Sequence, residues 1–398
     1  MRILTINTGS SSVKASVFAT AGGERLLLSA AGERLGAAGA RIKLSDAAGK
    51  TLREQRGDLP DHAAALRLLF GWLRDLDPQA APDAIGHRVV HGGARFIEPT
   101  RISAEMLAEL GKLEAIDPDH LPQAIAGIRL ALEAYPELPQ VACFDTAFHR
   151  HKPRVATLYG LPRGLLEAGI VRYGFHGLSY ESVLERLRTK APEAAAGRLV
   201  IAHLGNGASM AAVRDGVGVD TTMGFSPTGG LVMGTRTGDL DPGVLLYLQR
   251  QRGLSADALS ELVNTRGGLL GVSGTSSDMR DLLANERADP RAAEAVALFC
   301  YQAQKFLGGL VAVLGGLDCL VFTGGIGEHA AQVRARICSG LAFLGLALDE
   351  RRNAAHDAII SAETSRVRVR VLPTDEALMI ARHTARLVGE RGAADVHL

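Results

Sequence analysis

Two glycine-flanked segments each carry an arginine that could bind a small anion. They are residues 86–93, GHRVVHGG, with Arg88, and residues 233–238, MGTRTG, with Arg236. A guanidinium group stays charged, and its fork of donors matches the oxygens of a carboxylate or a phosphate. One such arginine is equally typical of a surface ion pair. Two that converge from separate segments could neutralise a transferring phosphoryl group and hold a small carboxylate.

Two acidic residues also occupy positions that suit catalysis. Asp145 follows the apolar run 141–144, VACF, and Glu376 lies in residues 373–378, PTDEAL. A carboxylate at the end of a buried strand can orient a nucleophile or a hydrated cation, but helix caps and first-turn acids are equally common. His87 and His91 have the spacing of a helical metal pair, yet the valines between them and the glycines after them favour a strand and a loop.

Three glycine-rich segments could place backbone N–H groups around a phosphate. They are residues 9–12, GSSS; residues 205–207, GNG; and residues 323–328, TGGIGE. Taken singly, each is more often an ordinary turn or a tight strand–helix connection. No G-x-x-x-x-G-K-[ST] sequence occurs, so a P-loop kinase is disfavoured.

The elements that must position these residues follow an α/β pattern of short apolar runs and longer amphipathic stretches. Residues 141–144, 199–202 and 320–322 predict buried strands. Helical spacing of apolar residues appears at 66–73, behind a possible Asp61 cap, and at 125–132, after Pro122.

A weak internal repeat adds to this pattern. Residues 3–17 resemble residues 199–213, since both are an apolar strand, a tight polar turn and a second strand. A spacing of half the chain suits a duplicated domain, and two similar lobes imply a cleft between them.

Composition narrows the class of protein. The 398 residues contain 44 Lys and Arg against 43 Asp and Glu, so no excess of positive charge favours a nucleic acid or a membrane surface. Four widely spaced cysteines without a C-x-x-C pair argue against disulfides and a zinc site. The N-terminal apolar run is too short for a signal peptide, and residues 306–317 are too short to span a bilayer. We therefore expect a cytoplasmic protein with reduced thiols.

Taken together, the motifs resemble the acetate kinase family of short-chain carboxylate kinases, within the sugar kinase, heat-shock ATPase and actin superfamily. The blocks that carry the resemblance are NTGSSS, HRVVHGG, FDTAFH, YGFHG, HLGNG and MGTR, which occur in the family's order almost from end to end. The resemblance implies ATP-dependent, reversible phosphorylation of acetate to acetyl phosphate, with Mg²⁺ or Mn²⁺ and usually a homodimer. It also implies two duplicated actin-like (ribonuclease H-like) α/β lobes with a central cleft, residues 1–146 with 382–398 and residues 147–381.

The resemblance also implies roles for individual residues. Arg88 and Arg236 would grip acetate and the transferring phosphoryl group, and Asp145 would position or polarise the attacking group. His176 would stabilise the transition state, and His120 would contact a phosphate. The implied magnesium residues are Asn7 and Glu376; the apolar wall of the carboxylate pocket, Val90, Phe175 and Pro227; the phosphate loops, Ser10, Ser12, Lys14, His203, Leu204, Gly205, Asn206 and Gly207; and the adenosine pocket, Asp278, Met279, Arg280, Gly324, Gly325, Ile326, Gly327 and Glu328.

This set is chemically coherent. Acetate is already an anion at neutral pH, so the difficulty is to bring two negative groups together, a problem of charge and position rather than of base strength. We therefore expect direct in-line transfer without a phosphoenzyme, and Val90 favours acetate ahead of propionate. The alternatives are a propionate or butyrate kinase of the same fold, or an actin- or chaperone-like ATPase switch. The donor could be ATP, GTP or pyrophosphate.

The chain departs from the family's usual residues at several positions. Asp119 stands before His120 where a leucine is common, Tyr180 replaces a second histidine, and Thr228-Gly229 replaces a Leu-Glu pair. His329 replaces an asparagine, and Ala377 replaces a second glutamate. None of these departures removes a main catalytic position.

Overall fold

The computed structural model describes residues 1–9, 11–76, 81–118 and 120–394. The chain divides into two compact units: unit 1 comprises Met1–Ala147 and the segment from Asp375 onward, and unit 2 comprises Phe148–Thr374. The resemblance placed the return to the first lobe at residue 382. In the structure the return comes at Asp375, because Ala377 and Leu378 already pack on the core of unit 1.

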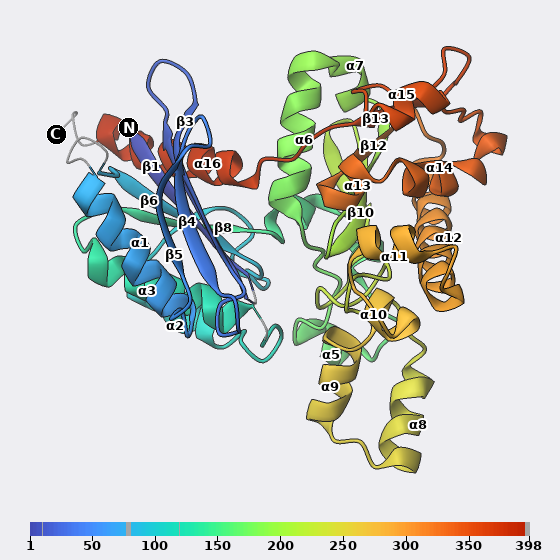
Figure 1. Ribbon diagram of the computed structural model, residues 1–398, viewed down its shortest axis with the longest axis horizontal. Helices are drawn as coiled ribbons and strands as arrows, with labels where there is room; N and C mark the ends of the chain where they lie inside the picture. The colour runs from blue at the N-terminus through green and yellow to red at the C-terminus, as the bar shows by residue number, and fades with distance from the viewer. Residues whose placement is uncertain (10, 77–80, 119, 395–398) are drawn as a thin grey trace. The chain divides into compact units, whose positions relative to one another are not determined.

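Unit 1 is built on an eight-stranded sheet of described residues (Figure 1). Strands β1 to β5 form an antiparallel series in chain order, β6 pairs parallel with β1 and with β8, and β7 pairs antiparallel with β8. In sheet order the strands are β5 (Thr51–Arg56), β4 (Arg41–Asp46), β3 (Arg25–Glu33), β2 (Val13–Ala19), β1 (Arg2–Thr8), β6 (Ala84–Val89), β8 (Gln140–Phe144) and β7 (Thr100–Arg101).

Helices cover both faces of this sheet. On one face α1 (His62–Leu76) and α3 (Leu121–Ala134) pack together, with α2 (Ala104–Gly111) beside α3, and on the other lies α16 (Glu376–Ala394) (Figure 1). The predicted helices are confirmed: residues 66, 69, 70 and 73 are buried on α1, and Asp61 accepts a hydrogen bond from Ala64 N at 2.7 Å as its cap. Ile125 and Ile128 are buried on α3.

Unit 2 contains a five-stranded sheet of described residues, with α6 on one face and α12 on the other. The strands in sheet order are β11 (Val217–Thr221), β10 (Ala208–Arg214), β9 (Arg198–Leu204), β12 (Cys319–Thr323) and β13 (Arg368–Val371). The helices are η2 (Ala147–His151), which begins at the unit boundary, α4 (Arg154–Thr157), α5 (Arg163–Glu167), α6 (Gly177–Lys190), α7 (Pro192–Ala195), α8 (Pro242–Arg252), α9 (Ala256–Asn264), α10 (Gly268–Ser273), α11 (Met279–Asn285), α12 (Pro290–Leu314), α13 (Gly324–His329), α14 (Ala331–Ser339), η3 (Ala342–Leu344) and α15 (Glu350–Ala354).

The two sheets share one core topology. In each, a strand pairs antiparallel with the next strand of the chain and parallel with a later one: β1 with β2 and β6, and β9 with β10 and β12. The orders β3-β2-β1-β6-β8 and β11-β10-β9-β12-β13 are therefore equivalent. The internal repeat read from the sequence is a structural duplication, and the predicted α/β class is confirmed.

One helix, α12, is long and apolar enough to cross a membrane, judged by length and composition alone and among the described residues. Within unit 2 it packs against β10, α10 and α14, and its buried side chains include Phe299, Leu307 and Leu310. The four cysteines are buried and form no disulfide.

Candidate active site

Four polar side chains of unit 1 meet at the carboxyl ends of three adjacent parallel strands. Ile6 pairs with His87 and Val89 pairs with Phe144, so Asn7, Arg88 and Asp145 lie at one edge of the sheet. Arg88 Nε lies 3.1 Å from both carboxylate oxygens of Asp145, and Nη2 lies 2.5 Å from Oδ2. Arg88 Nη1 donates to Asn7 Oδ1 at 3.2 Å.

Glu376 completes this group from the start of α16. Its Oε2 lies 3.8 Å from Arg88 Nε and accepts a long hydrogen bond from Asn7 Nδ2 at 3.5 Å. Burial acts to lower the pKa of Arg88, but the charges of Asp145 and Glu376 outweigh it, and the net pKa is raised. The neighbouring Asp375 caps α16 by accepting from Leu378 N at 2.9 Å. Glu376 therefore lies in the first turn of α16, and its carboxylate faces Arg88.

The chemistry of these residues fits a magnesium ion. Mg²⁺ is commonly held by one or two carboxylates with water and phosphate oxygens rather than by a full protein cage. Glu376 offers a carboxylate and Asn7 an amide oxygen at the same edge of the sheet. Among the described residues no group of three or more His, Cys, Asp and Glu side chains is placed to hold a metal, so such an ion would take most of its ligands from water and phosphate.

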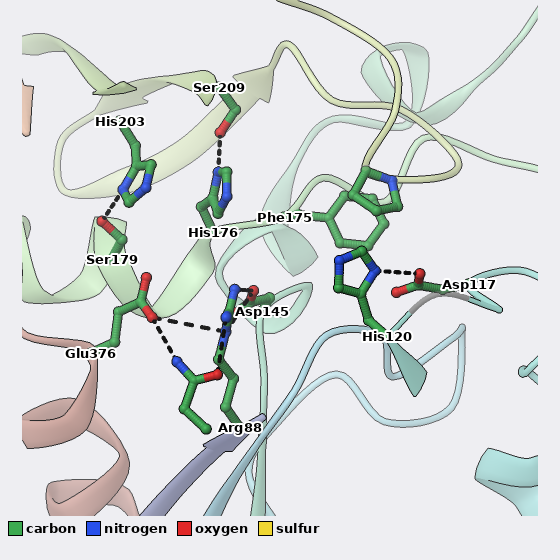
Figure 2. A network of polar contacts seen from close by, with 12 residues as sticks. Arg88, Asp117, His120, Asp145, Phe175, His176, Ser179, His203, Ser209 and Glu376 are labelled. Carbon is green, nitrogen blue, oxygen red and sulfur yellow. Dashed lines mark hydrogen bonds and ion pairs between the residues drawn. The ribbon is translucent and has the colours of Figure 1, made fainter. Parts of the chain in front are cut away.

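The other predicted residues of unit 1 lie in the same part of the fold. His120, at the N-terminus of α3, contacts Asp117 Oδ1 through Nδ1 at 2.8 Å (Figure 2). Val90 follows β6 and is buried, whereas Lys14 is exposed on β2 in register with Asn7. Ser12 O accepts from Gly9 N at 2.8 Å to close the first hairpin turn. Ser10 and Asp119 lie outside the described residues.

Unit 2 holds a pair of stacked histidines. The rings of His176 and His203 lie 4.3 Å apart with 23° between their planes. Each is held through Nδ1 by a fully buried serine: His176 by Ser209 Oγ at 2.8 Å, and His203 by Ser179 Oγ at 2.7 Å (Figure 2). Sequence reasoning found both histidines but neither serine, since nothing in either serine's neighbourhood in the chain marks it.

Gly207 brings the histidine pair and Arg236 together. A Cβ placed on Gly207 would lie 3.2 Å from His176 Nε2 and 3.8 Å from Arg236 Nη1. Arg236 Nη1 also donates to the carbonyl oxygen of the buried Pro227 at 3.2 Å. The second glycine loop, one predicted arginine and the predicted histidine are thus neighbours within unit 2.

His149 is a residue of this region that sequence reasoning did not select, although it lies in the quoted FDTAFH block. It is buried, and burial together with the nearby charge of Lys152 lowers its pKa to about 3. The neutral ring contacts the carbonyl oxygen of Phe175 through Nε2 at 3.0 Å. Since Phe175 is itself 1% exposed and directly precedes His176, this contact fixes the backbone that presents His176.

A cavity of about 530 Å³ opens beside the second glycine loop of unit 2. Its volume is that of a small-molecule site. Part of the wall is formed by residues that were predicted to bind the nucleotide. The wall also contains Ser277, Leu283, His329 and Ala330, which were not predicted to bind it. The predicted residues in the wall are Gly205, Asn206, Asp278, Met279, Arg280, Gly325 and Ile326.

Of the residues predicted for the adenosine pocket, three do not line the cavity: Gly324, Gly327 and Glu328. Gly324 has φ +79°, and a Cβ there would lie 2.7 Å from Leu204 O. Glu328 Oε1 accepts from Gly324 N at 3.0 Å. Leu204 and Gly324 therefore form the tight β9–α13 junction behind the cavity. That Arg88 of unit 1 and Arg236 of unit 2 act on one phosphoryl group remains a prediction.

Comparison with known proteins gives a consistent result. Residues 2–382 match the model of the acetokinase family. The chain is 46% identical to the acetate kinase of Methylocella silvestris, over 98% of this chain and 99% of that protein, and 47% identical to the acetate kinase of Rhizobium meliloti, over 98% and 99%. Crystal structures of a Porphyromonas gingivalis acetate kinase (TM-score 0.87, 36% identity) and a Francisella tularensis propionate kinase (TM-score 0.91, 35% identity) each match over 97% of this chain and 99% of theirs.

Proposed function

The chain belongs to the acetokinase family and phosphorylates acetate with ATP; we propose that the phosphoryl group passes directly and in line, without a phosphoenzyme. The observation that supports this most strongly is the junction at Gly207, where His176 Nε2 and Arg236 Nη1 face one point beside a glycine loop. Two donors aimed at one point suit charge that develops on a transferring phosphoryl group. No step then requires the protein to accept the phosphoryl group.

In unit 1, Arg88 would hold the acceptor and Asp145 would orient it. Asp145 occupies the edge of the guanidinium formed by Nε and Nη2, so the direction of Nη1 is fixed. An arginine held in this way loses little freedom when it binds a carboxylate, and orientation accounts for much of the rate in such reactions. Asp145 acts on the acceptor through Arg88 and need not act as a strong base.

Asn7 and Glu376 are the proposed magnesium residues. Bound there, Mg²⁺ would supply partial neutralisation of the negative charge of the phosphates. Glu376 would at the same time keep Arg88 charged and directed, since it lies 3.8 Å from Nε. Four further proposals rest on the resemblance to the family alone. They are the Mg²⁺ requirement, a homodimeric state, a cytoplasmic location, and the lack of a nucleic-acid or membrane partner.

The nucleotide is proposed to bind in unit 2. The 530 Å³ cavity would take the adenosine, and the loop of Asn206 and Gly207, with His203, would receive the phosphates. The β9–β10 turn is made of small residues, which allows the close approach to the backbone that phosphate needs. His120 and Lys14 remain proposed phosphate contacts in unit 1.

The test combines substrates with stereochemistry. Acetate, propionate and butyrate are assayed against ATP, GTP and pyrophosphate, and the acyl phosphate is trapped as a hydroxamate. We expect the highest kcat/KM with acetate and ATP. With a chiral γ-phosphate, in-line transfer inverts configuration, and retention would contradict it. ATP turnover that is indifferent to carboxylate would favour a nucleotide switch instead.

A propionate kinase is the second candidate, because the propionate kinase of Francisella tularensis is among the structural neighbours. The family resemblance assigns Val90, Phe175 and Pro227 to the apolar wall of the carboxylate pocket, and each of these side chains is buried within its own unit. One methylene changes discrimination by about 1–3 kcal/mol. A Val90→Ala enzyme should therefore gain activity on propionate relative to acetate, and an unchanged ratio would remove Val90 from that wall.

A further inference from the structure

Three side chains of unit 2 form a hydrogen-bonded line that ends at His176. Ser209 Oγ, on β10, lies 2.8 Å from His176 Nδ1, and the hydroxyl of Tyr180 hydrogen-bonds to the same Oγ from the first turn of α6 (Figure 2 shows the Ser209–His176 contact). Tyr180 and Ser209 are 0% exposed and His176 is 9% exposed. The line is therefore shielded from exchange with bulk water.

We propose that Tyr180 and Ser209 are positioning residues that fix the tautomer of His176, so that Nδ1 accepts and Nε2 carries the hydrogen. The serine hydroxyl has one hydrogen and lies between two partners. When it donates to Nδ1, the phenol hydrogen of Tyr180 fills its acceptor site. If Nδ1 carries the hydrogen instead, either Ser209 donates to the Tyr180 oxygen and the phenol hydrogen turns away from Ser209, or Ser209 accepts from both partners and its own hydrogen has no acceptor within this line. Because a phenol is a stronger donor than an alkyl hydroxyl, the first order is favoured.

The direction of Nε2 makes this tautomer useful. A Cβ on Gly207 would lie 3.2 Å from Nε2 and 3.8 Å from Arg236 Nη1, so an N–H on Nε2 joins a guanidinium N–H at the phosphate loop. The other tautomer would present a lone pair there, which repels a phosphoryl oxygen. This consequence rests on the proposed function of His176, whereas the tautomer itself does not.

The surroundings of His176 hold it in place for this role. Its φ of +60° is left-handed, a conformation that a non-glycine residue adopts only when its neighbours enforce it. His149 secures the preceding Phe175 carbonyl and lies 5.7 Å from the ring of Tyr180. The stacked His203 also disfavours the state in which both rings are charged, since two imidazolium rings 4.3 Å apart would repel each other.

The direct test is ¹⁵N NMR of the full-length protein labelled at histidine, with the His176 signals assigned from a His176→Gln variant. We expect a protonated Nε2 and an unprotonated Nδ1 at pH 8. Ser209→Ala should convert His176 to a mixture of both tautomers, and Tyr180→Phe should shift it in the same direction by less. A wild-type ring protonated at Nδ1, or one whose tautomer is unchanged in Ser209→Ala, would overturn the proposal.

Steady-state kinetics of the variants distinguish a positioning role of Ser209 and Tyr180 from a general loss of folding. Ser209→Ala should lower kcat roughly 10- to 100-fold with little change in the KM of ATP or acetate, since a misplaced group costs rate rather than binding. The double variant Ser209→Ala/Tyr180→Phe should resemble Ser209→Ala alone, because both act through one line. A kcat loss with an unchanged tautomer would refute the mechanism.

Ser179→Ala is the matched control. It removes the same hydroxyl from the neighbouring ring, His203, and should alter the His203 signals while the tautomer of His176 stays as in the wild type. A change at His176 in this variant would mean that general packing, not the Tyr180–Ser209 line, sets the tautomer. If the wild type shows no acetate-dependent transfer, the proposed function fails while the NMR result stands.

Discussion

Arg88 binds both carboxylate oxygens of Asp145, although the two residues lie 57 positions apart in the chain. The carboxylate is 1% exposed and the guanidinium side chain 17% exposed. Adjacent parallel strands, β6 and β8, bring them together. Removing one partner of such a pair is expected to destabilise the protein, because the charge of the other partner remains in a site shielded from water.

Arg88→Ala should therefore destabilise the protein as well as inactivate it. The buried Asp145 carboxylate would lose the guanidinium that neutralises its charge, which costs about 3 kcal/mol of unfolding free energy. Urea denaturation measures this loss. The control is Arg198→Ala, which removes the forked but exposed pair with Asp318 (42% and 46% exposed). Exposed pairs contribute about 0–1 kcal/mol, so equal losses in the two variants would contradict this account.

Gly207→Ala should disable the reaction with little effect on folding. The new Cβ would lie 3.2 Å from His176 Nε2 and 3.4 Å from Cε1, so the imidazole must shift. Displacement on this scale costs up to about 100-fold in kcat. Gly164→Ala is the control, since a Cβ there meets nothing within 4 Å. Wild-type kcat in Gly207→Ala would remove His176 from the site.

Substitution by alanine should lower stability at Gly324 but weaken ATP binding at the adjacent Gly325. Gly324→Ala places a Cβ 2.7 Å from Leu204 O at a φ of +79°, and should cost about 1–3 kcal/mol of stability. Gly325→Ala meets no protein atom within 4 Å but narrows the cavity. It should leave the melting temperature unchanged and raise the KM for ATP about tenfold, because the backbone there must let the nucleotide approach. An unchanged KM would move the nucleotide away from Gly325.

Glu376→Gln should weaken the response to magnesium. The amide keeps the size of the side chain but removes the negative charge, so the Mg²⁺ concentration for half-maximal rate should rise at least about tenfold. Asp375→Asn alters the cap of α16 while the Glu376 carboxylate stays in place, and its Mg²⁺ dependence should match the wild type. The proposed metal role fails if the two variants titrate alike.

The stability of the protein should fall in mild acid, partly because of His149. Its pKa is lowered from 6.5 to about 3 by burial, so below pH 6.5 the unfolded chain binds a proton that the folded chain excludes. Stability from this residue is thus fully present above pH 6.5 and is lost as pH falls toward 3. Between pH 7 and 5, His149→Gln should lose about 2 kcal/mol less than the wild type in urea denaturation. His151→Gln, at an exposed position, should behave like the wild type.

The sequence predicted the parts of the site that are local. The repeat of residues 3–17 and 199–213 revealed the duplicated sheets, and apolar runs that end in polar residues located Asp145, His203 and the 323–328 segment. Strand ends are informative because parallel neighbours bring their carboxyl ends to one edge. The apolar runs and the helical spacing correctly located the strands at 141–144, 199–202 and 320–322 and the helices around 66–73 and 125–132.

What sequence could not give is the support behind the site. Ser209 and Ser179 hold histidines from other elements, and their partners are set by the register of β10 on β9 and by the position of α6. The sequence shows His149 only as part of the FDTAFH motif and does not reveal that its ring contacts the backbone carbonyl of Phe175. Gly324 shares its motif with Gly325, and only the backbone angle and the closeness of Leu204 distinguish a structural glycine from one that lines the cavity.

The return of α16 to unit 1 sets an order of assembly. The N-terminus of a chain leaves the ribosome first, and domains generally fold as they emerge. Every residue of unit 2 is released before α16, while unit 1 still lacks the helix that covers Ile3 and Phe18. The carboxylate of Glu376 likewise reaches Arg88 only after all residues of unit 2 have been synthesised. A nascent chain therefore cannot form the Arg88–Glu376 contact until the whole of unit 2 has been synthesised.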